Sequence, residues 1–259
     1  MHRFGQHFLI RGQVATDIVK VVEISETDTV IEIGAGRGSL TKPLAETGAR
    51  VISYEVDASL KKLLQFKLKS FGNVELRFKD FLTVEPSELP RNCVCVGNIP
   101  YYISKEIIEK IVQLSFKRAI LMIQKEFADK MTAYPGGKNY RYISVLAQTF
   151  YDVQRVMTVS KKDFSPPPSV DSVVVKMELR NDIPNFVEYR NFIRFLLSSP
   201  GKNLSSVLKQ VFKGDTNKIL KKLNLPMMNT KVRRTPIETF LGLYKGWLSW
   251  KEQNSLNVY

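Results

Sequence analysis

The alternation of short apolar runs with amphipathic segments between residues 29 and 123 constrains the fold of this chain more than any other feature. The segments between the runs place their apolar residues at helical spacing, as in Ser39–Thr47, Ala58–Phe71 and Ser104–Leu114. Strands that alternate with helices form a parallel sheet covered on both faces, so an α/β fold is predicted. The predicted strands are Thr29–Ile33, Arg50–Val56, Val74–Phe78, Cys93–Gly97 and Ala119–Ile123, followed by Val153–Val159 and Ser172–Leu179 as an antiparallel pair at the sheet edge.

The pattern changes near residues 181–184, and from Asn185 onward the chain consists of short helical stretches separated by turns. We therefore predict an α/β domain over residues 1–180 and a small all-helical domain over residues 181–259. The formal net charge of the chain is +14, and residues 180–259 contain 14 basic but only five acidic side chains. A basic helical domain indicates a polyanionic partner, and nucleic acid is the simplest candidate.

Several classes of protein are disfavoured. No apolar run is long enough to span a bilayer, and the first seven residues lack the apolar core of a signal peptide, so we expect no membrane association. Cys93 and Cys95 fall on the same face of one short strand, which indicates buried free thiols in a reducing compartment rather than a disulfide. No metal-ligand spacing accompanies them. We expect a cytoplasmic, monomeric protein without a metal ion.

A glycine-rich loop follows the first predicted strand. Gly34, Gly36 and Gly38 let the backbone approach a bound nucleotide closely, although a simple tight turn would also use them. Their Gly-x-Gly-x-Gly spacing differs from the Gly-x-Gly-x-x-Gly of dinucleotide-binding folds. The loop resembles that of methyltransferases that bind S-adenosylmethionine.

Two acidic residues stand at the ends of the next two strands. Glu55, with its neighbour Val56, ends the second strand, where a carboxylate can accept hydrogen bonds from both ribose hydroxyls. Asp80, with its neighbour Phe81, follows the third strand, where it can accept from an adenine amino group. Either carboxylate alone could be an ordinary surface group, but both in this order predict a nucleoside-binding site.

The segment Asn98-Ile99-Pro100-Tyr101 lies between a predicted strand and a predicted helix, where open α/β sheets bind their ligands. The amide and the exposed backbone carbonyls can hold a planar amine, and the aromatic ring can stack on the base that carries it. A proline turn with a core tyrosine is the structural alternative. The glycine loop, Glu55 and Asp80, which precede it in the chain, favour a ligand-binding site.

With these motifs in this order, the chain resembles the ribosomal RNA adenine dimethyltransferases of the KsgA type over the whole α/β domain, and more weakly in the tail. The resemblance implies a Rossmann-like class I methyltransferase sheet and S-adenosylmethionine as cofactor. Further segments that carry the resemblance are Gly5–Leu9, with His7 where many members have Asn, Gln124–Glu126, Lys138–Val145 and Phe164–Ser172.

The family's activity is dimethylation of the exocyclic amines of two adjacent adenosines in a loop near the 3′ end of small-subunit ribosomal RNA. The resemblance therefore implies a pre-ribosomal small subunit as partner and an RNA-binding role for the helical tail. It assigns His7 and Leu9 to the cofactor, next to Gly34, Gly36, Glu55, Val56, Asp80, Phe81 and Asn98. We further expect Asn98 and Pro100 to bind the target amine, and Tyr101 and Phe164 to stack on the base. The alternative for Phe164 is an anchor of its loop, packed under the prolines.

Two alternatives stay open on the sequence alone. Large-subunit RNA adenine methyltransferases of the macrolide-resistance type often share Asn-Ile-Pro-Tyr, but Gln124–Glu126 and the triple proline Pro166–Pro168 favour the small-subunit enzyme. A non-catalytic nucleic-acid-binding factor could keep the same fold, but the intact tetrapeptide argues against it. Segment Ser198–Asn203 is less basic than its counterpart in the family, so its RNA contact is not predicted.

Overall fold

A computed structural model describes residues 6–180, 185–222 and 230–255. The chain forms two compact units. The described part of the first comprises residues 6–128 and 151–180, and that of the second comprises 129–150, 185–222 and 230–255. The expected boundary at 181–184 and part of the expected amino-terminal motif, Gly5, lie outside the described residues.

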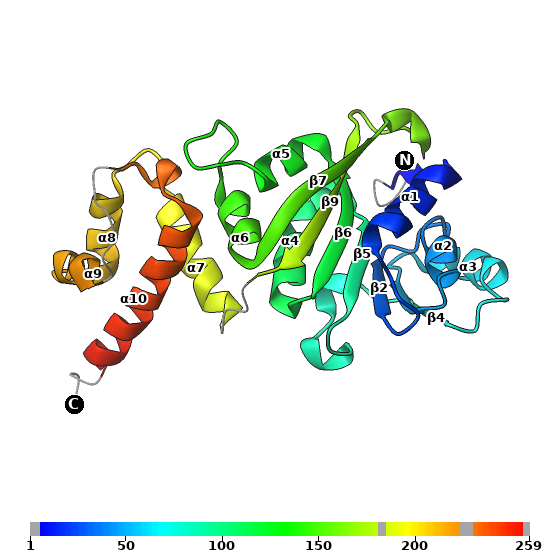
Figure 1. Ribbon diagram of the computed structural model, residues 1–259, viewed down its shortest axis with the longest axis horizontal. Coiled ribbons are helices and arrows are strands. Elements are labelled where there is room, and N and C mark those ends of the chain that lie inside the picture. Colours follow the sequence, from blue (N-terminus) through cyan, green and yellow to red (C-terminus); the bar gives the residue numbers. More distant parts are fainter. Residues whose placement is uncertain (1–5, 181–184, 223–229, 256–259) are drawn as a thin grey trace. The chain divides into compact units, whose positions relative to one another are not determined.

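A seven-stranded mixed sheet forms the first unit, in the order β4-β3-β2-β5-β6-β9-β7 (Figure 1). The first five strands are parallel, and β9 runs antiparallel to both of its neighbours. The predicted strands and the antiparallel edge pair are therefore confirmed, and no strand end is shifted by more than two residues. Their bounds are β2 Thr29–Ile33, β3 Arg50–Tyr54, β4 Val74–Arg77, β5 Val94–Asn98, β6 Arg118–Gln124, β7 Tyr151–Val159 and β9 Ser172–Leu179.

Both faces of this sheet are covered. Residues of one face form a core cluster with helices α1 (Gly12–Val22) and α2 (Thr41–Ala45), through side chains such as Val30, Val96 and Ile18. Alternate residues on the same strands point to the opposite face and are also fully buried: Ile31, Ile52, Cys95 and Leu121. This burial on both sides explains why the strands are continuous apolar runs rather than alternating ones. Helices α3 (Lys61–Lys67) and α4 (Ser104–Leu114) complete the α/β alternation.

The two central strands define the place where a ligand can enter. From β2 the chain continues to β3 and β4 on one side, whereas β5 and β6 lie on the other. Ile33 at the end of β2 pairs with Gly97 on β5, so both strands end at the same edge. Loops that leave two such strands diverge and open a crevice, which is the usual ligand site of open α/β sheets.

A second, two-stranded sheet joins distant parts of the sequence. Strand β1 (Phe8–Leu9) pairs antiparallel with β8 (Phe164–Ser165), with Leu9 opposite Phe164. This pairing brings the amino-terminal segment beside the proline-rich segment.

Helices form the second unit: α6 Tyr142–Phe150, α7 Phe186–Leu197, α8 Leu204–Phe212, α9 Thr216–Lys222 and α10 Ile237–Ser255. Helix α5 (Lys125–Met131) contains the division between the units. The Thr149 and Tyr189 hydroxyls lie 2.8 Å apart, and the Tyr189 ring packs edge-on against Phe150 and Tyr244. Because these contacts join α6 to α7 and α10, residues 129–150 group with the carboxy-terminal helices. The structural division therefore differs from the sequence-based division at residue 180.

Cys93 and Cys95 are buried and free, as expected. Within the described residues, no helix combines the length and apolarity needed to cross a membrane.

Candidate active site

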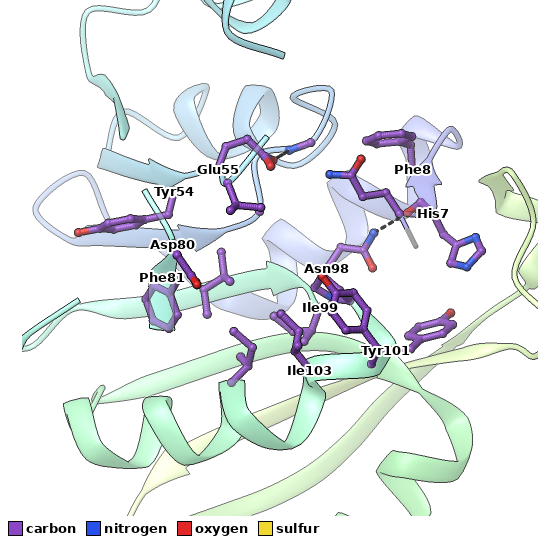
Figure 2. A pocket seen from close by; sticks show the side chains of 18 of the residues that line it. His7, Phe8, Tyr54, Glu55, Asp80, Phe81, Asn98, Ile99, Tyr101 and Ile103 are labelled. Carbon is purple, nitrogen blue, oxygen red and sulfur yellow. Dashed lines mark hydrogen bonds between the residues drawn. The ribbon is translucent and has the colours of Figure 1, made fainter. Parts of the chain in front are cut away.

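A pocket opens at the crevice between the loops that follow β2 and β5, and its walls also include residues from β1, β3 and the segment after β4 (Figure 2). The sequence-predicted residues that line it are His7, Gly34, Gly36, Glu55, Val56, Asp80, Phe81, Asn98, Pro100 and Tyr101. Residues from five separate segments thus meet at one edge of the sheet.

The Glu55 carboxylate holds the glycine loop in place. It is only 3% exposed; its Oε2 accepts a hydrogen bond from the Gly36 backbone N–H at 2.7 Å, and its Oε1 accepts one from Asp57 N–H at 2.8 Å. Gly34 and Gly36 have φ of +77° and +55°, and a Cβ on Gly36 would lie 3.3 Å from the Phe8 ring. Side chains at these positions would therefore strain the backbone and fill the pocket. A carboxylate has about four acceptor positions, so Glu55 keeps capacity for a ligand hydroxyl.

Beyond Glu55 the pocket wall is apolar. Phe81, which is buried, and Val56, which is half exposed, both line it. Asp80 is exposed beside them, and one of its oxygens accepts from Leu82 N–H at 2.9 Å. This arrangement fits a cofactor that contains a nucleoside. It combines the glycine loop, the buried carboxylate of Glu55, an apolar wall and the carboxylate of Asp80.

At the other end of the pocket, the Asn98 amide has a defined orientation. Its Nδ2 donates to the backbone carbonyl of His7 at 3.0 Å (Figure 2). This donation directs Oδ1 to the pocket as an acceptor. An oxygen in that position can accept a hydrogen bond from an amine.

The two residues after Ile99 lie beside Asn98. Pro100 O accepts from Ser104 Oγ at 3.2 Å and from Ile103 N–H at 3.3 Å, so it contributes to the turn as well as to the pocket. The Tyr101 hydroxyl lies 2.7 Å from Ser172 Oγ, which fixes the ring, and partial burial raises the pKa of this hydroxyl. Tyr101 is therefore a neutral, fixed aromatic surface.

Leu9 and Phe164 do not line the pocket. They are 5% and 2% exposed, they face each other across the β1–β8 pair, and both belong to the core cluster under α1. In this structure Phe164 anchors the proline-rich segment and presents no free face to a base. The geometry thus gives no support to the stacking role predicted for Phe164 or to direct cofactor contact by the Leu9 side chain, because strand pairing buries both.

Other pocket-lining residues were not singled out from the sequence. The most informative are Phe8, Tyr54, Ile99 and Tyr102. Each is next in sequence to a predicted site residue. Only Phe8 has a further signal in the sequence, because the lack of a side chain at Gly36 leaves room for its ring.

This sheet order, with the glycine loop after β2 and the carboxylate at the end of β3, defines a class I methyltransferase. Proteins of this class take their methyl group from S-adenosylmethionine, and the pocket suits that cofactor.

The comparisons with known proteins agree on one family. Residues 1–247 match the family described as ribosomal RNA adenine dimethylase. A protein from Thermotoga maritima named ribosomal RNA small subunit methyltransferase A is 40% identical over 246 residues, which cover 94% of this chain and 84% of that protein.

Solved structures of two RNA methyltransferases superpose on this chain over nearly its whole length. A dimethyladenosine transferase from Plasmodium falciparum superposes with a TM-score of 0.82 at 28% identity, covering 94% of this chain and 98% of that one. The 23S rRNA methyltransferase ErmE superposes with a TM-score of 0.70 at 26% identity, covering 93% and 99%. The chain belongs to the ribosomal RNA adenine dimethylase family. It is an S-adenosylmethionine-dependent methyltransferase of ribosomal RNA.

Proposed function

We propose that this enzyme dimethylates the exocyclic amines of two adjacent adenosines in a loop near the 3′ end of small-subunit ribosomal RNA. It acts as a monomer on a pre-ribosomal small subunit in the cytoplasm. The observation that carries this proposal is the oriented Asn98 amide, which offers an amine-binding oxygen at the pocket beside the glycine loop.

The chemical difficulty lies with the nucleophile. The exocyclic nitrogen of adenine shares its lone pair with the ring and attacks poorly. Asn98 Oδ1 and the Pro100 carbonyl accept hydrogen bonds from its two N–H groups, which favours tetrahedral geometry and frees the lone pair. When bound, S-adenosylmethionine supplies an already activated methyl group, so positioning and desolvation provide most of the acceleration.

No general base is required before transfer, because the nitrogen becomes acidic only once it carries the new methyl group. The cationic nitrogen then releases one proton to solvent. Tyr101 stacks on the target base, which must leave its RNA stack to enter the pocket. Glu55 accepts from the ribose hydroxyls of the cofactor, and Asp80 accepts from its adenine amino group. Val56 and Phe81 contact that adenine, while Gly34, Gly36 and the backbone of His7 surround the rest of the cofactor.

The small subunit is favoured over the large one. Relatives at about 40% identity are named for the small subunit, whereas the large-subunit enzyme ErmE is more distant at 26% identity. Gln124–Glu126 and Pro166–Pro168 point the same way. The basic helices after residue 185 bind RNA or the ribosome.

The test incubates the protein and methyl-labelled S-adenosylmethionine with each purified ribosomal subunit from cells that lack the modification. We expect label in the small subunit and two N6,N6-dimethyladenosines per RNA on nucleoside analysis. Label in the large subunit, or monomethyladenosine as the only product, would overturn the proposal. A heat-inactivated sample of the protein serves as the control for label carried over without catalysis.

A further inference from the structure

Gln6, His7 and Phe8 line the pocket, and His7 contacts Asn98, Tyr101 and the proline-rich segment. We propose that His7 is a positioning residue for methyl transfer: its imidazole holds its own backbone carbonyl under the Asn98 amide, so that the amide oxygen faces the target amine. This inference rests on the proposed role of Asn98 in binding that amine.

The first step concerns the amide itself. The two ends of an asparagine amide are nearly equal in size, so only hydrogen-bond partners decide which end faces a ligand. Nδ2 of Asn98 donates to His7 O at 3.0 Å. A carbonyl oxygen accepts and never donates, so this contact selects the orientation with Oδ1 in the pocket. The opposite orientation would present N–H donors to the N–H donors of the substrate amine.

The second step concerns what holds the carbonyl. The His7 ring nitrogen Nδ1 lies 2.8 Å from the carbonyl oxygen of Pro166, 159 residues away in sequence. Because Pro166 O is an acceptor, Nδ1 carries the proton. The same ring lies 5.6 Å from the Tyr101 ring at an interplanar angle of 33°. Residue 7 is thus fixed by its side chain to the segment that lies beside the proposed base-stacking surface.

Neighbouring contacts fix the next two residues separately. Ser39 Oγ donates to Leu9 O at 2.8 Å, and the Arg37 guanidinium lies 4.4 Å from the Phe8 ring centre. These contacts hold the segment to the glycine loop. The bond to Pro166 is the hydrogen bond that the His7 side chain makes, and the contacts of Phe8 and Leu9 do not depend on it. Its loss should therefore move the His7 carbonyl without unfolding β1.

Isosteric substitutions test this role. Asn Nδ2 occupies the same place along a side chain as His Nδ1, whereas the Gln amide lies one bond farther out. His7→Ala and His7→Gln should lower kcat for RNA methylation about tenfold at saturating cofactor, which is the usual effect of losing one hydrogen bond. His7→Asn keeps a donor at the same position, so its kcat should stay within about threefold of the wild type. Arg11→Ala, two residues beyond the segment Gln6–Leu9, removes only an exposed ion pair to Asp163; it is the matched control and should leave kcat unchanged.

Two kinetic results would overturn the proposal. One is equal kcat for His7→Asn and His7→Gln. The other is a rise in the dissociation constant of S-adenosylmethionine in His7→Ala with no change in kcat, since this would make His7 a cofactor ligand only.

A second measurement needs no RNA and so separates this inference from the proposed function. In ¹⁵N NMR spectra of the free protein, the hydrogen-bonded Asn98 side-chain proton should resonate downfield in the wild type and in His7→Asn. It should move upfield and exchange faster with solvent in His7→Ala and His7→Gln. Unchanged Asn98 amide signals across the series would contradict the positioning role, whatever RNA the wild-type enzyme methylates.

Discussion

The Asn98 side chain donates its amide hydrogen to the backbone carbonyl of His7 over 3.0 Å, although 91 residues separate the two in sequence. The contact joins the end of β5 to the amino-terminal segment, two elements that share no local sequence pattern. It fixes the orientation of the Asn98 amide, so that the oxygen, which is a hydrogen-bond acceptor, faces the pocket.

Asn98→Ala should remove that acceptor and leave the cofactor pocket intact. We expect methyl transfer to fall by about two to three orders of magnitude, the usual cost of losing a preorganised hydrogen-bonding group at a reacting centre. S-adenosylmethionine should bind within a few-fold of the wild type, as measured by calorimetry. Dimethylation at the wild-type rate would show that Asn98 has no part in amine binding.

Glu55→Gln should weaken cofactor binding. The carboxylate accepts from two backbone N–H groups, and an amide nitrogen in place of one oxygen would face a donor that it cannot bond. We expect the dissociation constant of S-adenosylmethionine to rise about 10- to 100-fold, since hydrogen bonds to charged groups contribute about 1.5–3 kcal/mol. Glu46→Gln makes the same chemical change at an exposed ion pair on the end of α2 and should leave that constant unchanged. Equal cofactor affinity in the two variants would contradict the role of Glu55.

Substitutions at Tyr101 should separate its ring from its hydroxyl. Tyr101→Phe keeps the aromatic surface and loses only the bond to Ser172, so we expect a stability loss of about 1 kcal/mol and nearly full activity. Tyr101→Ala should reduce kcat/KM for RNA by about 5- to 150-fold, because base–aromatic stacking contributes about 1–3 kcal/mol. Steady-state kinetics with small subunits as substrate measures both. If Tyr101→Ala and Tyr101→Phe have equal kcat/KM, the ring does not stack on the base.

Glu32 should make stability depend on pH. Its side chain is fully buried on β2; its Oε2 accepts from Ser53 Oγ at 2.6 Å, and burial raises the pKa of its carboxyl to about 7. The folded protein therefore keeps this proton up to about pH 7, whereas the unfolded chain releases it near its usual pKa of 4.5. The free energy of unfolding contributed by Glu32 should fall as pH rises from about 4.5 to about 7 and stay level above that.

Glu32→Gln removes this titration. The difference in unfolding free energy between Glu32→Gln and wild type should shift in favour of the variant by about 3 kcal/mol from pH 4.5 to pH 8. Urea denaturation at a series of pH values measures it, and subtracting the two proteins cancels other groups such as Asp28. A difference that does not change with pH would mean that the pKa of Glu32 is the same in the folded and unfolded protein.

The second structural unit shows where the sequence-based division differs from the structural one. The sequence-based boundary at residue 180 places residues 129–150 in the α/β domain, because they lie between two predicted strands. In the structure, Thr149 and Phe150 on α6 contact Tyr189 on α7, and α6 also packs against α10. Periodicity identifies an amphipathic helix but not the surface that covers it.

The sequence by itself determined the α/β alternation and most of the candidate site. Buried parallel strands must be apolar, and residues at the ends of parallel strands meet at one edge, so the order of the motifs alone brings Gly34, Glu55, Asp80 and Asn98 together. Only the tertiary structure decided the orientation of the Asn98 amide, the burial of Phe164 and the hydrogen bond of His7 to Pro166. These depend on the pairing of β1 with β8 and on hydrogen bonds between segments about 90 to 160 residues apart. In both hydrogen bonds the acceptor is a backbone carbonyl, which every residue carries, so the sequence does not show which residue Asn98 or His7 will bond.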